Sequence, residues 1–402
     1  MRFSHPQAIL RRWQFGWPVL LFGLLSVGCA ETPAPTPATA PPAPVTPVTA
    51  AADETPAPVA DEGLATAPYP TDSAHKNAPA PSLTFERPAL HYTGWELGTN
   101  LNITIVTPDQ KGASRAVDET VALIRKFNVA TSSWMPGTDI AKINDAAGKK
   151  PVKVSALTLE QVDLALQASR ETDGAFDPTW AAMWGLWNYS ADHPKVPTDE
   201  ELAAKLPLIN YKDVVVDHEQ STVFLKREGM KLDLGGITKG SITAKIGALL
   251  KQKGFNEFLV QIGGELMAAG KNQRGELWRV GMQHPRNTNY FVAAPYLTDV
   301  NISTSGDYER FFMQDGKRYH HIIDPKTGRP SRGLIMVTVI GTDGALCDGY
   351  ATALMIFGQA KTEAFVAKHP ELKVVTIDRD GNIWCNDPAL RKQYPEKIEA
   401  GE

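Results

Sequence analysis

Residues 31–81 limit what this chain can fold into more than any other feature. They are dominated by alanine, proline and threonine and contain scarcely a large apolar side chain. Such a segment cannot bury enough surface to offset the conformational entropy lost on folding. We therefore predict a disordered, proline-stiffened tether over residues 30–82. A globular body of roughly 320 residues, placed at 83–395, carries the remaining apolar periodicity.

Residues 1–29 have the form of an export signal. Arginines at positions 2, 11 and 12 precede an apolar stretch over 15–27, which is short and interrupted by Pro18, and so argues against a permanent transmembrane helix. The stretch ends in "LLSVGCA", which resembles a bacterial lipoprotein cleavage site with Cys29 as the lipidated residue. We expect an exported lipoprotein anchored to the inner membrane and facing the periplasm. The sequence leaves open whether the general or the twin-arginine route exports it.

Charge and cysteine content exclude some classes of protein. The net charge is −4 and no concentrated basic face is visible, which argues against a general nucleic-acid binder. No Cys/His spacing suits structural zinc. After Cys29 only Cys347 and Cys385 remain, and whether they form a disulfide is left open.

The periodicity of the body favours an α+β fold with mixed β-sheets and flanking helices. Strands are predicted at 100–107, 211–217, 222–226, 257–262, 300–304, 319–323 and 334–341, and helices at 113–127, 157–171 and 348–357.

The stretch "KLDLGGITKG", residues 231–240, is the first candidate site. Alternation predicts a strand that stops at the glycines, and a helix is predicted after Gly240. A helix N-terminus is a natural seat for phosphate, and Lys239 would add a positive charge. It is not a Walker loop, because Gly240 separates Lys239 from Ser241. A plain strand–helix turn explains the glycines equally well.

Two further segments carry candidate chemistry. Asp348 and Thr352 in "CDGYATAL" lie one helical turn apart and could supply two oxygen ligands to Mg²⁺. A helix cap at Asp348 and packing at Thr352 are the simpler interpretation. In "RYHHIIDPKTG", His321 could act as a general base, although adjacent histidines are often incidental.

The segment "DGAFDPTW" forms a tight loop, in which Phe176 could stack on a flat ring. The tryptophans at 180, 184 and 187 follow helical spacing and are predicted to belong to the core.

Taken together and in this order, the motifs resemble those of the FAD:protein FMN transferases, the ApbE family of bacterial lipoproteins. The blocks are "SSWMPGTDIAKIN", "GAFDPT", "DLGGITKG", "IGGE", "STSGDYERFF", "HIIDPKTG" and "DGYATAL", running from about Phe85 to Ile383. The resemblance implies an ApbE-like flavin transferase fold, with residues 83–395 forming the FAD-binding domain.

The resemblance also implies roles for individual residues. His321 would be the catalytic base, and Asp348, Thr352 and the backbone carbonyl of Gly236 would bind Mg²⁺. The expected FAD contacts are Asp233, Lys239, Ala175, Phe176, Asp177 and the backbone near Ile322, with Met135 and Asp307 as further flavin contacts.

The implied activity is Mg²⁺-dependent transfer of FMN from FAD to a threonine or serine hydroxyl of a partner redox protein, which forms a phosphoester and releases AMP. The expected acceptors are subunits of membrane redox complexes, such as sodium-pumping NADH:quinone reductases. One alternative is an FAD pyrophosphatase that yields FMN and AMP. Another is a non-catalytic flavin-binding lipoprotein, against which the intact Asp348, Thr352 and His321 argue.

Overall fold

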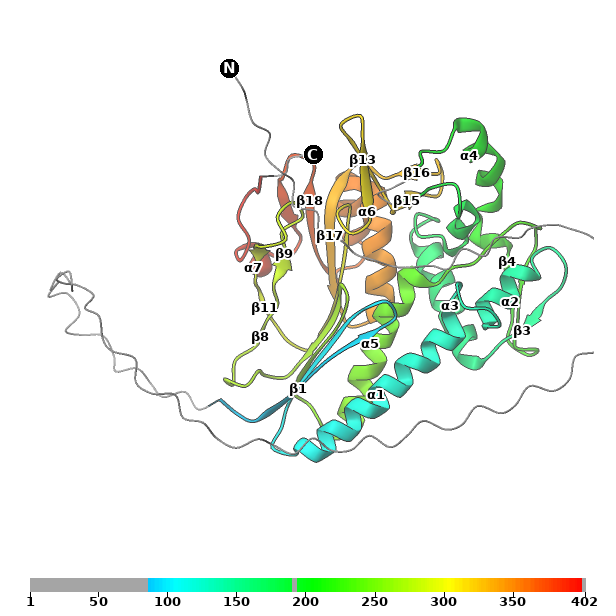
Figure 1. The fold of residues 1–402 in the computed structure, drawn as a ribbon. Helices are drawn as coiled ribbons and strands as arrows, with labels where there is room; N and C mark the ends of the chain where they lie inside the picture. Colours follow the sequence, from blue (N-terminus) through cyan, green and yellow to red (C-terminus); the bar gives the residue numbers. More distant parts are fainter. Residues whose placement is uncertain (1–85, 190–193, 400–402) are drawn as a thin grey trace, which may run out of the picture. The chain divides into compact units, whose positions relative to one another are not determined.

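An antiparallel sheet is the centre of the computed structural model, which describes residues 86–189 and 194–399 (Figure 1). Within these residues the sheet has eight strands, in the order β1 (Ala89–Glu96), β2 (Thr99–Val106), β6 (Phe258–Ile262), β7 (Glu265–Ala269), β12 (Val300–Gly306), β17 (Leu334–Gly341), β18 (Lys373–Asp378) and β19 (Ile383–Cys385). The predicted signal over 1–29, its Cys29, and the tether over 30–82 lie outside the described residues.

The four longest helices, α1 (Gln110–Thr131), α3 (Ala156–Glu171), α5 (Gly235–Gln252) and α6 (Gly344–Val366), cover one face of the sheet (Figure 1). The other α-helices are α2 (Asp139–Asp145), α4 (Asp199–Lys205) and α7 (Pro388–Arg391). α1 and α5 share one core cluster with β2 and β6, and α3 and α6 share a second with β17 and β18. The predicted α+β fold with flanking helices is confirmed.

The opposite face of the sheet carries small antiparallel pairs. They are β8 (Trp278–Arg279) with β11 (Tyr296–Leu297), and β9 (Met282–Gln283) with β10 (Phe291–Ala293). Alternation along β17 separates the two cores, because Val337 and Val339 pack with the α6 side while Met336 and Ile340 pack with the β8–β11 side. Side chains of a strand alternate between faces, so this central strand is buried on both.

Three smaller sheets complete the body. β3 (Val152–Lys153), β5 (Thr222–Leu225) and β4 (Val214–Asp217) form one; β13 (Phe311–Gln314) with β14 (Lys317–His320), and β15 (Ile323–Asp324) with β16 (Arg329–Pro330), form the others. The predicted pairing of the strands near 211–217 and 222–226 is confirmed, except that Tyr211–Asp213 is a 3₁₀ turn.

The predicted strand at 231–234 is wrong, and α5 begins earlier than expected, at Gly235. Leu232 and Leu234 are buried as in a strand, but no β-ladder pairs them. The side chain of Asn144 instead bonds both backbone groups of Leu232, at 2.6 and 3.0 Å. The glycines of "GGITKG" therefore lie inside the first turns of the helix rather than in a loop before it.

Two other boundaries differ from the prediction. The strand expected over 319–323 is interrupted, because β14 ends at His320 and β15 begins at Ile323. The helix expected from Asp348 begins at Gly344, and its N-cap is Asp343, whose carboxylate accepts from the Leu346 amide. Asp348 therefore lies one turn inside α6 and is not its cap.

Cys347 and Cys385 are both free thiols in the structure. Across the described ranges, no helix is both long and apolar enough to cross a membrane.

Glycines bring the first turns of α5 and α6 into direct contact. A Cβ added at Gly240 would lie 2.0 Å from the Gly344 carbonyl oxygen, and one added at Gly344 would lie 2.4 Å from the Gly240 oxygen. Real Cβ atoms do not approach backbone so closely, so only glycine permits this spacing at either position.

Replacing Gly240 with alanine is expected to destabilise the protein by about 3 kcal/mol, because backbone on both helices must move apart. Helix propensity alone would make the alanine variant more stable by about 1 kcal/mol, so the sign of the change in unfolding free energy distinguishes the two effects. Chemical denaturation measures the change. Ala248→Gly, at an exposed position on the same helix, is the control and should lose only about 1 kcal/mol. A Gly240→Ala variant as stable as the parent would contradict the proposed constraint.

Candidate active site

A lysine and two buried carboxylates meet where α5, α6 and β7 come together. Asp348 Oδ2 accepts a hydrogen bond of 3.0 Å from the Gly240 amide. Lys239 Nζ lies 3.4 Å from Glu265 Oε1 and 3.8 Å from Asp348 Oδ2. Lys239 and Asp348, which were predicted separately from two motifs, are therefore in contact. Glu265, from the "IGGE" block, is a third member of the cluster for which the sequence predicted no role.

The charges of this cluster do not balance. Burial raises the pKa of Asp348, although Lys239 opposes the shift. Burial and the neighbouring Asp348 raise the pKa of Glu265 to about 7. Burial alone would lower the pKa of Lys239, but the carboxylates of Asp348 and Glu265 outweigh it and raise that pKa. Two carboxylates facing one ammonium make the cluster a place where a further cation is favourable.

The hydroxyl of Thr352, one helical turn after Asp348 on α6, lies close to a second neutral hydroxyl. Thr352 Oγ1 is 3.4 Å from Ser305 Oγ, and it is 3.8 Å from the position that a Cβ on Gly236 would take. Gly236 therefore lies near Thr352, while the predicted ligand set of Asp348, Thr352 and the Gly236 carbonyl stays a prediction. The buried Oε2 of Glu265 accepts no direct hydrogen bond from the described residues, although the Ser303 hydroxyl is close enough to lower the pKa of this carboxyl. These residues fit a hard, oxygen-preferring cation such as Mg²⁺.

Residues 86–189 and 194–399 contain no group of three or more His, Cys, Asp or Glu side chains that could hold a metal. The predicted set has only one carboxylate and depends on a hydroxyl and a carbonyl.

Asp233 connects the "SSWMPGTD" loop to the start of α5. Its carboxylate accepts a hydrogen bond of 2.6 Å from Ser133 Oγ and one of 2.9 Å from the Gly235 amide. Burial raises the pKa of Asp233 despite these bonds. Ser133 was not predicted as a site residue, although it lies in a quoted motif. Met135, two residues further on, is exposed and next to Trp134, whose ring stacks on Trp184 at 4.2 Å.

The loop of Ala175, Phe176 and Asp177 packs against the first turn of α5 at Gly236. The Phe176 ring is buried and would lie 3.0 Å from a Cβ on Gly236. Both carboxylate oxygens of Asp177 are already bonded: Oδ1 accepts from the Thr179 amide and hydroxyl, and Oδ2 accepts from the Tyr211 amide at 2.9 Å. These contacts position the loop next to α5, and the predicted FAD contacts of these residues remain predictions.

The two adjacent histidines differ in their surroundings. His320 is 3% exposed, with Nε2 2.8 Å from the Ser331 carbonyl oxygen and Nδ1 3.3 Å from the Ile322 amide, which donates to it. Both of its ring nitrogens are therefore committed to structure. His321 lies in the bend after β14, and its buried Nδ1 has no partner. Only His321 retains a ring nitrogen for chemistry.

The charge of Lys239 acts electrostatically on His321. Burial, followed by the charges of His320, Arg310 and Lys239, lowers the pKa of His321 to about 4. Arg310 and Lys239 also act on Asp233, which places all of these groups within one electrostatic environment. A histidine with this pKa is neutral at pH 7, the state that can accept a proton.

His321 is expected to titrate near pH 4 in the ligand-free protein, well below the ordinary 6.5. Since its folded pKa is depressed, it contributes stability above pH 6.5 that is lost as the pH falls toward 4. NMR of histidine-labelled protein measures the midpoint, and the resonance is assigned by its loss in His321→Gln. A midpoint at 6 or above would contradict the buried environment.

Asp307 and Ile322 have partners of their own. Arg286 donates two hydrogen bonds to the Asp307 carboxylate, at 2.7 and 3.0 Å. The Ile322 carbonyl accepts from the Ser331 amide at 3.0 Å. The structure therefore shows both residues in well-anchored positions, while their predicted contacts with flavin remain untested.

Comparisons with known proteins match nearly the whole body. The ApbE family model matches residues 97–376. An FAD:protein FMN transferase of Vibrio cholerae serotype O1 is 32% identical over 305 residues, covering 73% of this chain and 89% of the relative. One from Klebsiella pneumoniae (strain 342) is 29% identical over 306 residues, covering 76% of this chain and 94% of the relative.

Solved structures of ApbE proteins have the same fold as this chain. The ApbE protein of Thermotoga maritima superposes with a TM-score of 0.70 at 28% identity, covering 77% of this chain and 100% of its own. The flavin transferase ApbE from Vibrio cholerae gives 0.68 at 29% identity, with 77% and 100% coverage. The relatives' shared name, FAD:protein FMN transferase, and the matching fold show that the chain is a transferase enzyme. The chain belongs to the ApbE family.

Proposed function

We propose that this protein transfers FMN from FAD to a threonine or serine hydroxyl of a partner redox protein and releases AMP. The observation that carries the proposal is the junction of α5 and α6, where Lys239, Asp348 and Glu265 meet beside the first turn of a helix. The names of the relatives, FAD:protein FMN transferase, support the same activity.

The start of α5 is suited to a pyrophosphate. The N-cap residue, Leu234, makes no side-chain cap, and no acidic residue lies in the first turn, although the preceding Asp233 accepts from the Gly235 amide. The helix dipole attracts anions at such an end, and Lys239 adds a full positive charge. The phosphates of FAD would lie here, with the FMN-side phosphorus facing the acceptor.

His321 supplies the proton acceptor. Its neutral ring takes the proton from the acceptor hydroxyl while the hydroxyl oxygen forms a bond to the FMN-side phosphorus. The bond from that phosphorus to the bridging oxygen breaks, and AMP leaves with the bridging oxygen. Lys239 stabilises the charge that develops on the phosphoryl oxygens.

We also propose that Asp348, Thr352 and the Gly236 carbonyl hold Mg²⁺. The ion would neutralise phosphate charge and polarise the phosphoryl group. The support is the excess of buried carboxylate over lysine at this junction.

Hydrolysis of FAD to FMN and AMP is the alternative within the same site, with water in place of the hydroxyl. A binding protein without catalysis is the other alternative, and the unpartnered Nδ1 of His321 argues against it.

Mass spectrometry distinguishes these functions. The full-length protein is incubated with FAD, Mg²⁺ and a threonine-bearing domain of a sodium-pumping NADH:quinone reductase, or with the same domain carrying valine at that threonine. Transfer predicts a mass gain equal to FMN on the threonine form alone. Free FMN and AMP with both domains unmodified would indicate a hydrolase. FAD that stays bound and is not converted would indicate a flavin-binding protein without catalytic activity.

We propose further that the chain is a lipoprotein, anchored through Cys29 at the inner membrane and facing the periplasm. The support is the sequence of residues 1–29 alone. Metabolic labelling with a fatty acid should mark the parent protein and not Cys29→Ser, and an unlabelled parent would refute the anchor.

A further inference from the structure

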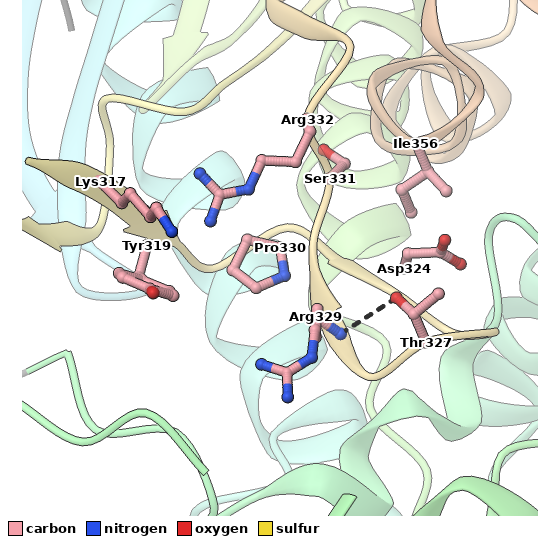
Figure 2. A pocket seen from close by; sticks show the side chains of 9 residues that line it. All are labelled: Lys317, Tyr319, Asp324, Thr327, Arg329, Pro330, Ser331, Arg332 and Ile356. Carbon is pink, nitrogen blue, oxygen red and sulfur yellow. Dashed lines mark hydrogen bonds between the residues drawn. The ribbon is translucent and has the colours of Figure 1, made fainter. Parts of the chain in front are cut away.

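A basic cavity of about 460 Å³ lies next to the segment that carries His321 (Figure 2). Its lining comes from β14, from β15 and β16 with the turn between them, from the two residues after β16, and from α6. The lining residues are Lys317, Tyr319, Asp324, Thr327, Arg329, Pro330, Ser331, Arg332 and Ile356.

Cations outnumber carboxylates in this lining. Lys317, Arg329 and Arg332 face one acid, Asp324, whose Oδ1 accepts from the Lys326 amide at 2.9 Å. Arg329 is paired with Asp199 at the rim, so it is partly neutralised. Lys317 is exposed and has no ion-pair partner in the described part of the chain. The cavity therefore favours an anionic ligand.

Arg332 is held in place but keeps free donors. Its guanidinium lies 5.3 Å from the centre of the Tyr319 ring, and its Nη1 donates to the Arg318 carbonyl at 3.1 Å. A guanidinium has five N–H donors, so one bond leaves others for a carboxylate. Figure 2 shows its guanidinium extending toward Lys317 and Tyr319.

Ser331 has a buried hydroxyl without a hydrogen-bond partner, which is a second, independent indication of a ligand site. The residue is 6% exposed and its hydroxyl has no hydrogen-bond partner, although it lines the cavity. Its backbone is fixed on both sides, because its amide donates to the Ile322 carbonyl at 3.0 Å and its carbonyl oxygen lies 2.8 Å from His320 Nε2. A buried hydroxyl held in place without a partner is costly, and an anion in the cavity would accept from it.

The same backbone contacts connect the cavity to the candidate base. Ser331 is bonded to His320 and Ile322, the residues on either side of His321, and Tyr319 lies two residues before it. A ligand in the cavity would thus lie beside the segment that positions His321. The charged groups of FAD are its phosphates, which the proposed function places at the start of α5, so an anion bound in this cavity would come from the acceptor protein.

We propose that this cavity binds an acidic side chain of the acceptor protein, near the hydroxyl that receives FMN. Lys317 and Arg332 pair with the carboxylate, the Ser331 hydroxyl donates to it, and Tyr319, Pro330 and Ile356 contact its apolar neighbours. The inference rests on the proposed function, because it assigns a role to the acceptor.

Direct binding tests the site without turnover. Two fluorescein-labelled peptides with one threonine, flanked either by glutamates or by glutamines, are titrated with FAD-loaded full-length protein, and anisotropy is recorded. The acidic peptide is expected to bind about tenfold more tightly, as two charge-assisted contacts allow. Lys317→Glu/Arg332→Gln should abolish the preference, and Ser331→Ala should reduce it several-fold. Lys111→Glu, an exposed lysine on α1, is the matched control and should keep it.

Equal binding of the two peptides, or a preference that survives Lys317→Glu/Arg332→Gln, would overturn the proposal. Loss of the preference in Lys111→Glu as well would overturn it too, since bulk charge would then explain the binding. FAD affinity of each variant, measured by flavin fluorescence, reports whether it is folded, and Lys317→Glu alone tests the site if the double variant misfolds. If the preference follows the cavity charges but no FMN is transferred to any acceptor, the proposed function fails while the anion site stands.

Discussion

Replacing Asp348 with asparagine is expected to lower the rate of FMN transfer about a thousandfold, a loss typical of removing one charge-stabilising group from an active site. The amide oxygen of asparagine still accepts from the Gly240 amide, so the contact between α5 and α6 is kept. The variant loses the charge that pairs with Lys239 and the anionic ligand proposed for Mg²⁺. Steady-state rates measured across a magnesium titration separate a weaker metal affinity from a lower maximal rate.

Asp343→Asn is the matched control for this variant. Asp343 caps α6 one turn earlier, and asparagine is also a good cap, so both stability and transfer should change little. Unchanged transfer by Asp348→Asn at limiting magnesium would remove Asp348 from the proposed metal site.

Replacing His321 with glutamine is expected to lower transfer by about a hundredfold to ten-thousandfold, the usual contribution of a general base. FAD affinity should change little, because the phosphate seat at α5 is intact. Rapid-mixing measurement of AMP release from bound FAD gives the chemical step directly, and flavin fluorescence gives the binding.

His320→Gln distinguishes a catalytic from a structural effect. Its ring is bonded to the Ser331 carbonyl, so this variant should lose about 1 kcal/mol of stability but retain transfer within a few-fold. If His320→Gln were the less active of the two at equal stability, the base would have to be assigned differently.

Much of this site could be predicted from the sequence because its chemistry lies in short, ordered motifs. Asp348 and Thr352 are one turn apart in a helix, so their shared face follows from helical geometry alone. The contact between Lys239 and Asp348 could not be predicted from periodicity, because it depends on the packing of two helices that are far apart in the chain.

The errors have local physical causes. The alternation at 231–234 is that of a strand, but Asn144 satisfies the backbone of Leu232 and no neighbouring strand pairs with it. The sequence predicts a strand-to-helix junction at the glycines of "GGITKG". They lie within α5 instead, and at Gly240 the reason is the close approach of Gly344. The positions of Glu265 and Ser133 in the site depend on strand register and on the closure of a loop. Neither can be predicted from a single sequence.

The glycine contact between α5 and α6 also bears on how long the protein survives in a cell. Asp348 and Glu265 are both buried at this junction and share one lysine, so the two carboxylates repel each other unless a further cation binds. Ligands that bind only the folded state add stability, about 2.7 kcal/mol at a hundred times their dissociation constant. Limited proteolysis should therefore cleave ligand-free protein faster than protein with FAD and Mg²⁺, and equal rates would contradict this. Where flavin is scarce, unloaded copies would be degraded first, and the abundance of the enzyme would follow the supply of its substrate.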